Sequence, residues 1–470
     1  MFKMEKRMNF DHLDQIRFHV SQTVREVMEK FNETAIYTQG KGFGVVEDEN
    51  NCCVGIVTDG DIRNHLIKGG LIDAQITEVM NREFVYSYPE DSPHKILRLF
   101  DHRVRTIPVI DHHRLLVGLL QYSDFTVSAR LEDKVIRSRV PVRVSFAGGG
   151  TDMSFYICRN NGFVLNSTIN KYCYATIRVR PDSKIRIISK DYQKECEADG
   201  FQNFIYGDSL DLIKACIRIM EPEFGFDIET YSEIEPGTGL GGSSAIAAAV
   251  IGALNHFRNQ NHLNKYHIAD LAYQAERIDL GIAGGWQDQY ATVFGGLNLL
   301  EFRPNEVIVY PIRVEEDVML ELHYNLLLFR FGKNRDSGCV ANDQEKTFNQ
   351  SASVMEVKYD KMTQLTLKMK DMLLRGSLRE FGELLHEGWE IKKALSTEIS
   401  NGFIENLYSA ARNAGAIGGK VLGAGKCGYL LLFCPPAQQL AVAETLQALG
   451  AIKENFDFVD TGLQTWTAHY

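Results

Sequence analysis

The chain of 470 residues lacks several features that define whole classes of protein. Its longest apolar run, residues 245–254, is far shorter than the about 20 residues that a membrane-spanning helix needs. Residues 1–10 lack the apolar core of a signal peptide. The nine cysteines include no CxxC pair and no histidine spacing typical of a zinc site. We therefore expect a cytoplasmic protein with reduced thiols and no membrane segment.

Positive charge is also scarce. Lysine and arginine together number 51 against 61 aspartate and glutamate, which gives a net charge of −10. This balance argues against a broad nucleic-acid or anionic-membrane surface and favours small-molecule partners, with any basic pocket being local. An apolar content of 44% and a mean hydropathy of −0.19 are ordinary for a globular protein, and the length predicts two or three domains.

The segment Pro236–Ala245, PGTGLGGSSA, places a glycine-rich turn and two serines directly before an apolar, helix-like run. Glycines adopt positive φ and let the backbone approach an anion, and the start of the following helix attracts negative charge. No Gly-Lys-Ser/Thr follows at Walker A spacing. A tight turn with a serine N-cap is the alternative. The candidate phosphate-binding residues are Gly237, Gly239, Leu240, Gly241, Gly242, Ser243, Ser244 and Ala245.

Two further glycine-rich segments accompany this one. Residues 139–152, RVPVRVSFAGGGTD, alternate like a strand and break at three glycines, and residues 419–428, GKVLGAGKCG, precede an apolar strand. In this order the three segments resemble the motifs of the GHMP small-molecule kinases, from about residue 137 to the C-terminus. Within that superfamily, AGGGTD, ERIDLGIAGGWQDQYATVFGG (276–296) and HEGWEIKK (386–393) resemble the D-glycero-D-manno-heptose 7-phosphate 1-kinases.

Two segments upstream look like copies of one unit. Residues 43–63 and 107–125 each show the pattern strand, turn, strand and helix, offset by about 60 residues, and each follows a helix-like segment. One copy has too little core to stand alone, so we expect the two to pack together. They resemble a tandem pair of CBS domains. That resemblance implies an adenosine-ribose contact at Thr58 and Asp61, and at Asp124 in the second copy, where Gln121 replaces the hydroxyl residue.

The resemblances imply an α+β chain in which a CBS-domain pair precedes a GHMP kinase fold, itself built of a ribosomal S5-like N-terminal half and a ferredoxin-like C-terminal half. The expected divisions are an extension at 1–17, the CBS pair at 18–130 (about 18–72 and 73–130), a linker at 131–137, and kinase halves at 138–315 and 316–470. The CBS pair predicts a homo-oligomer and one adenine-nucleotide site. A pair that serves dimerisation alone is the alternative.

The kinase resemblance also assigns roles, with ATP and Mg²⁺ as cofactors. It implies that Asp288 accepts or orients the proton of an anomeric hydroxyl, and that Arg143 stabilises charge on the moving phosphoryl group. Glu276 is expected to bind Mg²⁺ together with the hydroxyl of Ser243 or Ser244. The alternatives are a turn aspartate at Asp288 and a helix-surface ion pair at Glu276.

Sugar recognition is expected at the first and third motifs, with basic residues for a distal phosphate. The expected substrate-binding residues are Gly149, Gly150, Thr151, Asp152, Arg335, Lys392, Lys393, Gly423 and Gly425. A solvent-facing role is the alternative for the lysines. The third motif departs from the usual all-small turn because it contains Lys426 and Cys427.

The predicted function is ATP-dependent phosphorylation of the anomeric hydroxyl of a heptose 7-phosphate, for nucleotide-heptose and surface-polysaccharide synthesis. Adenine nucleotide near Thr58 and Asp61 is expected to modulate it. A second hypothesis is a kinase for fucose, galactose or an N-acetylhexosamine, although fucokinases usually read GGWSDTPP in place of AGGGTDM. A third is a catalytically weak nucleotide sensor, against which the joint presence of Arg143, Glu276 and Asp288 argues.

Overall fold

The computed structural model describes residues 13–34, 42–101, 104–122, 135–257, 262–332, 338–425 and 428–468. The chain divides into two compact units, Met1–Leu131 and Glu132–Tyr470. Each unit has its own core. Within the described residues, none of the helices combines the length and the apolar character needed to cross a bilayer.

The first unit contains both predicted copies of the strand hairpin. Strands β2 and β3 pair antiparallel, β1 joins β2 in parallel, and β4 and β5 form the second hairpin. The elements are β1 (Arg17–His19), α1 (Val24–Thr34), β2 (Phe43–Glu47), β3 (Cys53–Thr58), α2 (Asp59–Ile67), α3 (Pro93–Leu99), β4 (Thr106–Ile110) and β5 (Leu116–Gln121), with 3₁₀ turns at Leu13–Gln15 and Ile76–Glu78.

The two copies pack on each other, as their small individual cores predict. Backbone hydrogen bonds join them, among them one from Cys53 N to Arg114 O at 2.8 Å and one from Asn81 N to Ile56 O at 2.8 Å. One buried apolar cluster draws on both copies: Ile16, Phe43, Val45 and Cys53 meet Phe84, Ile110, Leu116 and Leu119. Ile16 lies in the expected N-terminal extension, so the end of that segment belongs to the core of the unit.

A mixed sheet forms the larger half of the second unit. Its strand order is β12-β11-β7-β10-β8-β9, and β6 pairs with both β7 and β17. Helix α6, which follows the glycine-rich turn, is almost wholly buried because its small apolar residues pack between this sheet and neighbouring helices. The strands are β6 (Val135–Ala147), β7 (Gly162–Val179), β8 (Lys184–Ser189), β9 (Lys194–Asp199), β10 (Phe226–Ser232), β11 (Leu297–Phe302), β12 (Val307–Pro311) and β17 (Gln464–Ala468).

The helices of this half are α4 (Ser154–Ile157), α5 (Asp211–Met220), α6 (Gly242–Asn255), α7 (Lys265–Tyr273) and α8 (Gln287–Phe294), with a π-helical turn at Gln274–Asp279 and a 3₁₀ turn at Phe201–Asn203.

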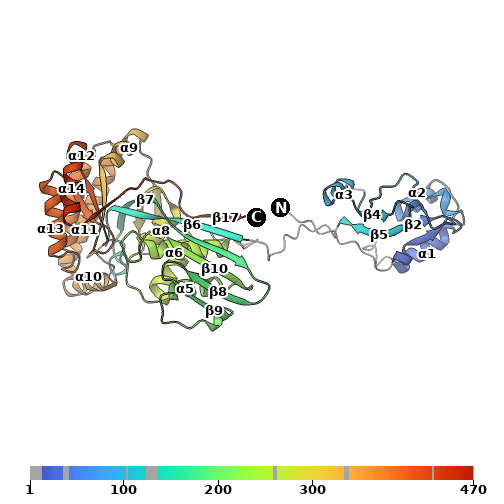
Figure 1. Ribbon diagram of the computed structural model, residues 1–470, viewed down its shortest axis with the longest axis horizontal. Helices are drawn as coiled ribbons and strands as arrows, with labels where there is room; N and C mark the ends of the chain where they lie inside the picture. The colour runs from blue at the N-terminus through green and yellow to red at the C-terminus, as the bar shows by residue number, and fades with distance from the viewer. Residues whose placement is uncertain are drawn as a thin grey trace. The chain divides into compact units, whose positions relative to one another are not determined.

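An antiparallel sheet of order β14-β15-β13-β16 forms the other half, with helices α11 to α14 gathered beside it in the orange and red part of the chain (Figure 1). This arrangement agrees with the expected α+β fold. Its elements are α9 (Glu316–Asn325), β13 (Leu326–Phe331), α10 (Gly338–Gln350), α11 (Ala352–Leu374), α12 (Leu378–Lys393), α13 (Gly402–Asn413), β14 (Gly418–Val421), β15 (Gly428–Phe433), α14 (Gln439–Ala448) and β16 (Ile452–Glu454), with a 3₁₀ turn at Pro436–Gln438.

The structure moves two expected boundaries. Residues 135–137, assigned to the linker, begin strand β6 because they pair with both β7 and β17. Strand β17, assigned with the C-terminal half, returns to the large sheet and pairs antiparallel with β6. The pairing joins segments far apart in the sequence: the Arg139 side chain in β6 donates to Gln464 in β17, 325 residues away. Position in the sequence therefore assigned these residues to the wrong part of the fold.

Deleting residues 463–470 is expected to lower the melting temperature of the second unit, measured by scanning calorimetry. The deletion removes the β17 ladder, opens an edge of β6, and takes away Thr465 and Thr467, which contact the His256 ring at 3.0 and 3.1 Å. Deleting only residues 469–470, which lie beyond β17, is the control. Equal melting temperatures for the two truncations would contradict the closing role of β17.

Candidate active site

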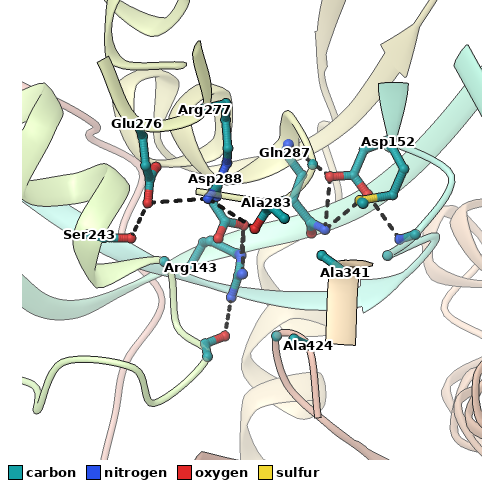
Figure 2. A pocket seen from close by; sticks show the side chains of 18 of the residues that line it. Arg143, Asp152, Ser243, Glu276, Arg277, Ala283, Gln287, Asp288, Ala341 and Ala424 are labelled. Atoms are coloured by element: carbon teal, nitrogen blue, oxygen red, sulfur yellow. Dashed lines mark hydrogen bonds and ion pairs between the residues drawn. The ribbon is translucent and has the colours of Figure 1, made fainter. Parts of the chain in front are cut away.

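One polar pocket gathers residues from both halves of the second unit (Figure 2). The large-sheet half supplies the end of β6, the glycine-rich turn, the π-helical turn and the start of α8. The other half supplies α10, α12 and the third-motif turn. The lining residues are Arg143, Gly149, Gly150, Asp152, Met153, Gly237, Thr238, Gly239, Gly241, Gly242, Ser243, Glu276, Arg277, Ala283, Gly284, Gly285, Gln287, Asp288, Ala341, Gln344, Lys392, Gly423 and Ala424.

The glycine-rich turn takes the conformation that its sequence predicts. Gly237, Gly239 and Gly241 have φ of 76°, 84° and 80°, and Gly241 is the N-cap of α6 without a side-chain cap. A Cβ on Gly239 would lie 2.5 Å from the Leu422 carbonyl oxygen, so the second and third motifs touch backbone to backbone. The serine N-cap alternative is wrong, because the helix begins one residue before Ser243.

Arg143 joins three parts of the site. Its guanidinium contacts Asp288 Oδ1 at 2.6 and 2.8 Å and donates to the carbonyl of Gly239 at 2.6 Å. The side chain is only 2% exposed, so these partners compensate a buried charge. No hydrogen bond to Asp288 Oδ2 is found among the described residues, and Asp288 lines the pocket. One carboxylate oxygen is therefore free to accept a proton from a ligand.

Glu276 is buried in the π-helical turn that follows α7, and its carboxylate meets the start of α6. Ser243 Oγ donates to Glu276 Oε1 at 2.5 Å, and Ser244 Oγ and Gln289 Nε2 each donate to Oε2 at 2.8 Å. Arg277 lies 3.5 Å from Oε1 (Figure 2). The expected alternative of an exposed surface ion pair is wrong, since Glu276 is 1% exposed.

The two serines of this turn differ in their surroundings. Ser243 is exposed and lines the pocket, whereas Ser244 is fully buried and lies outside the lining. A hydroxyl plus one carboxylate is an oxygen donor set suited to Mg²⁺, which uses few protein ligands and takes the rest from phosphates and water. Ser243 and Glu276 therefore fit a magnesium ion, and Ser244 positions the carboxylate.

Asp152 closes the turn after the three glycines. Its carboxylate accepts from Gly150 N at 2.9 Å and from Gln287 N at 3.1 Å, and a Cβ on Gly285 would lie 1.9 Å from its Oδ2. Burial raises the pKa of this carboxyl above its ordinary value, against the backbone hydrogen bonds that lower it. Thr151 instead supports the turn, with its hydroxyl bonded to Gly148 O and Phe163 O.

The two lysines of residues 386–393 have different surroundings at the end of α12. Lys392 is 5% exposed, lines the pocket and donates to the Gly423 carbonyl. Burial chiefly lowers its pKa to about 8, helped by the positive charge of Arg143. Lys393 lies outside the lining, and its ammonium contacts Glu390 at 2.9 Å and Glu405 at 3.0 Å. The structure therefore brings Lys392 alone of the pair to the pocket.

In the first unit, Thr58 and Asp61 bind each other. Thr58 caps helix α2, its hydroxyl donates to Asp61 Oδ2 at 2.6 Å, and its backbone N–H donates to the same carboxylate at 2.9 Å. Gln121 ends β5 and is buried. The two proposed ribose contacts thus lie adjacent at the end of β3.

The remaining expected residues lie elsewhere. Gly425 has φ of 113° and packs on the Ile399 backbone outside the lining, and Leu240 and Ala245 are fully buried. Arg335, Asp124, Lys426 and Cys427 fall outside the described residues.

Sequence reasoning missed several lining or supporting residues. Gln287 and Gln289 flank Asp288 in the first turn of α8 and bind Asp152 and Glu276, a role that their place in the matched segment could have indicated. Arg277 directly follows Glu276 and also lines the pocket. Gln344 comes from α10, which carries no motif.

Profile comparisons agree with the fold and the site. The profile of the GHMP kinases N terminal domain matches residues 211–296, and the GHMP kinases C terminal profile matches residues 369–452. D-glycero-alpha-D-manno-heptose 7-phosphate kinase of Campylobacter jejuni is 35% identical over 340 residues, 71% of this chain and 99% of the relative. The chain belongs to the GHMP kinases. The predicted ATP-dependent kinase is therefore confirmed at the level of the family.

Solved structures extend the comparison. A D-glycero-D-manno-heptose 1-phosphate kinase of Bacteroides thetaiotaomicron superposes with a TM-score of 0.59 at 33% identity, covering 71% of this chain and all (100%) of that one. A putative sugar kinase of Campylobacter jejuni gives a TM-score of 0.57 at 33% identity, covering 73% and 100%. The CBS domain profile matches residues 14–68 and 76–127, which confirms the CBS pair. The GHMP kinase fold of this chain thus carries an additional N-terminal unit.

Replacing Gly285 with alanine is expected to lower kcat/KM about a hundredfold, because the new Cβ occupies the position of the Asp152 carboxylate and displaces it. Gly402→Ala is the matched control, since a Cβ there meets no atom within 4 Å. Steady-state kinetics, with circular dichroism to verify folding, measure the effect. Equal kcat/KM for the two variants would contradict the tight contact at Gly285.

Proposed function

We propose that this GHMP kinase transfers the γ-phosphoryl group of ATP to the anomeric hydroxyl of D-glycero-D-manno-heptose 7-phosphate, for nucleotide-heptose and surface-polysaccharide synthesis. The observation that carries the proposal is that the Arg143–Asp288 pair, the glycine-rich turn and the buried Lys392 line one pocket. The names of the Campylobacter and Bacteroides relatives support the same substrate class.

In this proposal Asp288 receives the proton of the anomeric hydroxyl. Arg143 holds Oδ1, which leaves Oδ2 to accept the proton as the hydroxyl oxygen attacks the phosphorus atom. An anomeric hydroxyl is more acidic than an ordinary alcohol, so a carboxylate suffices as base once water is excluded. The guanidinium, held between Asp288 and Gly239 O, lies where it can stabilise charge on the transferring phosphoryl group.

The glycine-rich turn is proposed to bind the nucleotide phosphates, and Ser243 with Glu276 to hold Mg²⁺. The support is local: the turn lines the pocket, starts helix α6, and lies beside a carboxylate that carries the needed oxygens. When bound, the ion would offset the charge of the nucleotide phosphates. Ser244 and Gln289 keep the Glu276 carboxylate oriented through hydrogen bonds to Oε2.

Asp152 is proposed to accept hydrogen bonds from sugar hydroxyls, and Lys392 to meet the distal phosphate. Asp152 is held rigidly by Gly150 N and Gln287, and both side chains line the same pocket. A sugar without a phosphate would leave the buried Lys392 ammonium without an anionic partner, which favours phosphorylated substrates.

At the CBS pair we propose an adenine-nucleotide site at Thr58 and Asp61, and assembly of the chain into a homo-oligomer. The hydroxyl and the carboxylate lie within 2.6 Å of each other at the end of β3, which supports joint contact with a ribose. Ribose hydroxyls would then replace the hydrogen bonds that the two side chains make with each other.

The decisive experiment compares acceptors in an ADP-release assay with Mg-ATP. We expect turnover with D-glycero-D-manno-heptose 7-phosphate and none with fucose, galactose or N-acetylhexosamines. Asp288→Asn is expected to abolish turnover, because the amide can still accept from Arg143 but cannot take up a proton. Turnover of an unphosphorylated sugar would overturn the substrate, and absence of turnover with every sugar would favour a nucleotide sensor.

Glu276→Gln is expected to raise the Mg²⁺ concentration needed for half-maximal rate, with about a hundredfold lower kcat, because a neutral amide replaces the metal carboxylate. Ser243→Ala is expected to shift the Mg²⁺ concentration needed for half-maximal rate as well. Ser244→Ala is the matched comparison, since Ser244 lies outside the pocket. A larger shift in the Mg²⁺ midpoint for Ser244→Ala than for Ser243→Ala would contradict the assignment.

A further inference from the structure

Lys420 is a buried lysine that the proposed chemistry does not use. It lies on strand β14, directly before the third-motif turn, and is 4% exposed. Across the part of the chain that the structure describes, its ammonium has neither a hydrogen bond nor an ion pair. Burial without a partner disfavours the charged form of this side chain, and an anion bound beside it would restore that form.

Strand geometry directs Lys420 towards helix α12. A Cβ on Gly418 would lie 1.9 Å from the carbonyl oxygen of Gly382 in α12, so that face of β14 meets the helix. Side chains two residues apart share a face, which puts Lys420 on the α12 side as well. Three residues further on, the Gly423 carbonyl accepts from Lys392 at the end of α12. The two lysines therefore occupy the same α12–β14 interface.

The charges around this interface are unbalanced. Burial lowers the pKa of Lys420 well below its ordinary value, and the positive charges of Lys392 and Arg143 lower it further. Asp152 opposes this shift but is already bonded to Gly150 N and Gln287. Asp288, the other carboxylate near Lys392, is paired with Arg143.

Three side-chain hydrogen-bond donors gather on one side of Gly149. The position of a Cβ on Gly149 would lie 3.5 Å from Gln287 Nε2, 3.7 Å from Lys392 Nζ and 3.8 Å from Ser145 Oγ. Ser145 is 3% exposed, and its hydroxyl has no hydrogen-bond partner among the described residues. Gly149, Gln287 and Lys392 all line the pocket, so a ligand group over Gly149 would meet these donors together.

We propose that the phosphate group carried by the sugar substrate binds over Gly149, where Lys392 and Ser145 contact it and Lys420 supplies the additional buried positive charge. The inference rests on the proposed function, because it assigns the phosphate of a phosphorylated sugar to this place. It adds Lys420 and Ser145 as specificity-determining residues. The dianion of a phosphomonoester suits this place because it can stabilise the charged form of both lysines, which a sugar hydroxyl cannot do.

The test compares Lys420→Met with Lys214→Met in the full-length protein. Lys214 is also buried, at 2% exposure, but its ammonium has partners: it donates to Ile205 O, Asp208 and Asp211. Lys420→Met is expected to raise the melting temperature without ligand, because it removes a buried polar group that has no partner among the described residues and keeps the apolar stem. Lys214→Met is expected to lower it. A purely structural role for Lys420 would give the same sign in both variants.

Kinetics supply the second readout. Lys420→Met is expected to raise KM for heptose 7-phosphate about tenfold or more, with KM for ATP unchanged, as loss of a charge-assisted contact predicts. Ser145→Ala is expected to raise the same KM by a smaller factor. Inorganic phosphate should raise the melting temperature of the wild type more than that of Lys420→Met at equal ionic strength.

Each outcome separates this inference from the substrate assignment. Unchanged KM for heptose 7-phosphate in Lys420→Met would overturn the inference and leave the proposed function standing. A rise in KM for ATP alone would overturn it in favour of a nucleotide-phosphate contact. If the enzyme uses an unphosphorylated sugar, the proposed function fails, and the inorganic phosphate measurement still decides whether Lys420 serves an anion site.

Discussion

The buried guanidinium of Arg143 is the interaction on which the rest of the site depends. It leaves strand β6 and binds Asp288 at the start of α8 and the Gly239 carbonyl in the glycine-rich turn. An arginine that is 2% exposed requires partners, since removing one partner of a buried ion pair costs about 3–5 kcal/mol. The same contact that stabilises this charge thus fixes the distance between the proposed base and the proposed phosphate-binding turn.

The second constraint is the close approach of two glycine turns. Gly239 lies against the Leu422 carbonyl, and a Cβ on Gly423 would lie 2.4 Å from Gly239 Cα. Only glycines allow this approach at these φ values. Because one turn belongs to each half of the kinase unit, the contact joins the halves at the pocket. Lys392 donates to the Gly423 carbonyl in one of these turns, and so lies in the same pocket as Arg143.

Charge is distributed unequally over this pocket. Glu276 is satisfied by three uncharged donors and lies beside Arg277, and Asp288 is satisfied by Arg143. Lys392 has only a carbonyl partner, and Lys420 has none among the described residues. The carboxylates are therefore organised before any ligand arrives, whereas the cations on the α12–β14 side are left for a ligand to balance. Such a division sacrifices stability for binding, as active sites commonly do.

The sequence alone predicted the fold class and the CBS pair, and its resemblance to the GHMP kinases suggested the roles proposed for Arg143, Asp152, Glu276 and Asp288. Short glycine-rich motifs record such features because their turns impose local backbone conditions. Only the tertiary structure distinguished Ser243 from Ser244 and Lys392 from Lys393. Neighbouring helical residues point about 100° apart, so adjacent residues of one type meet different surroundings. The return of β17 to β6 and the burial of Lys420 also required the structure, since both depend on contacts between segments far apart in the chain.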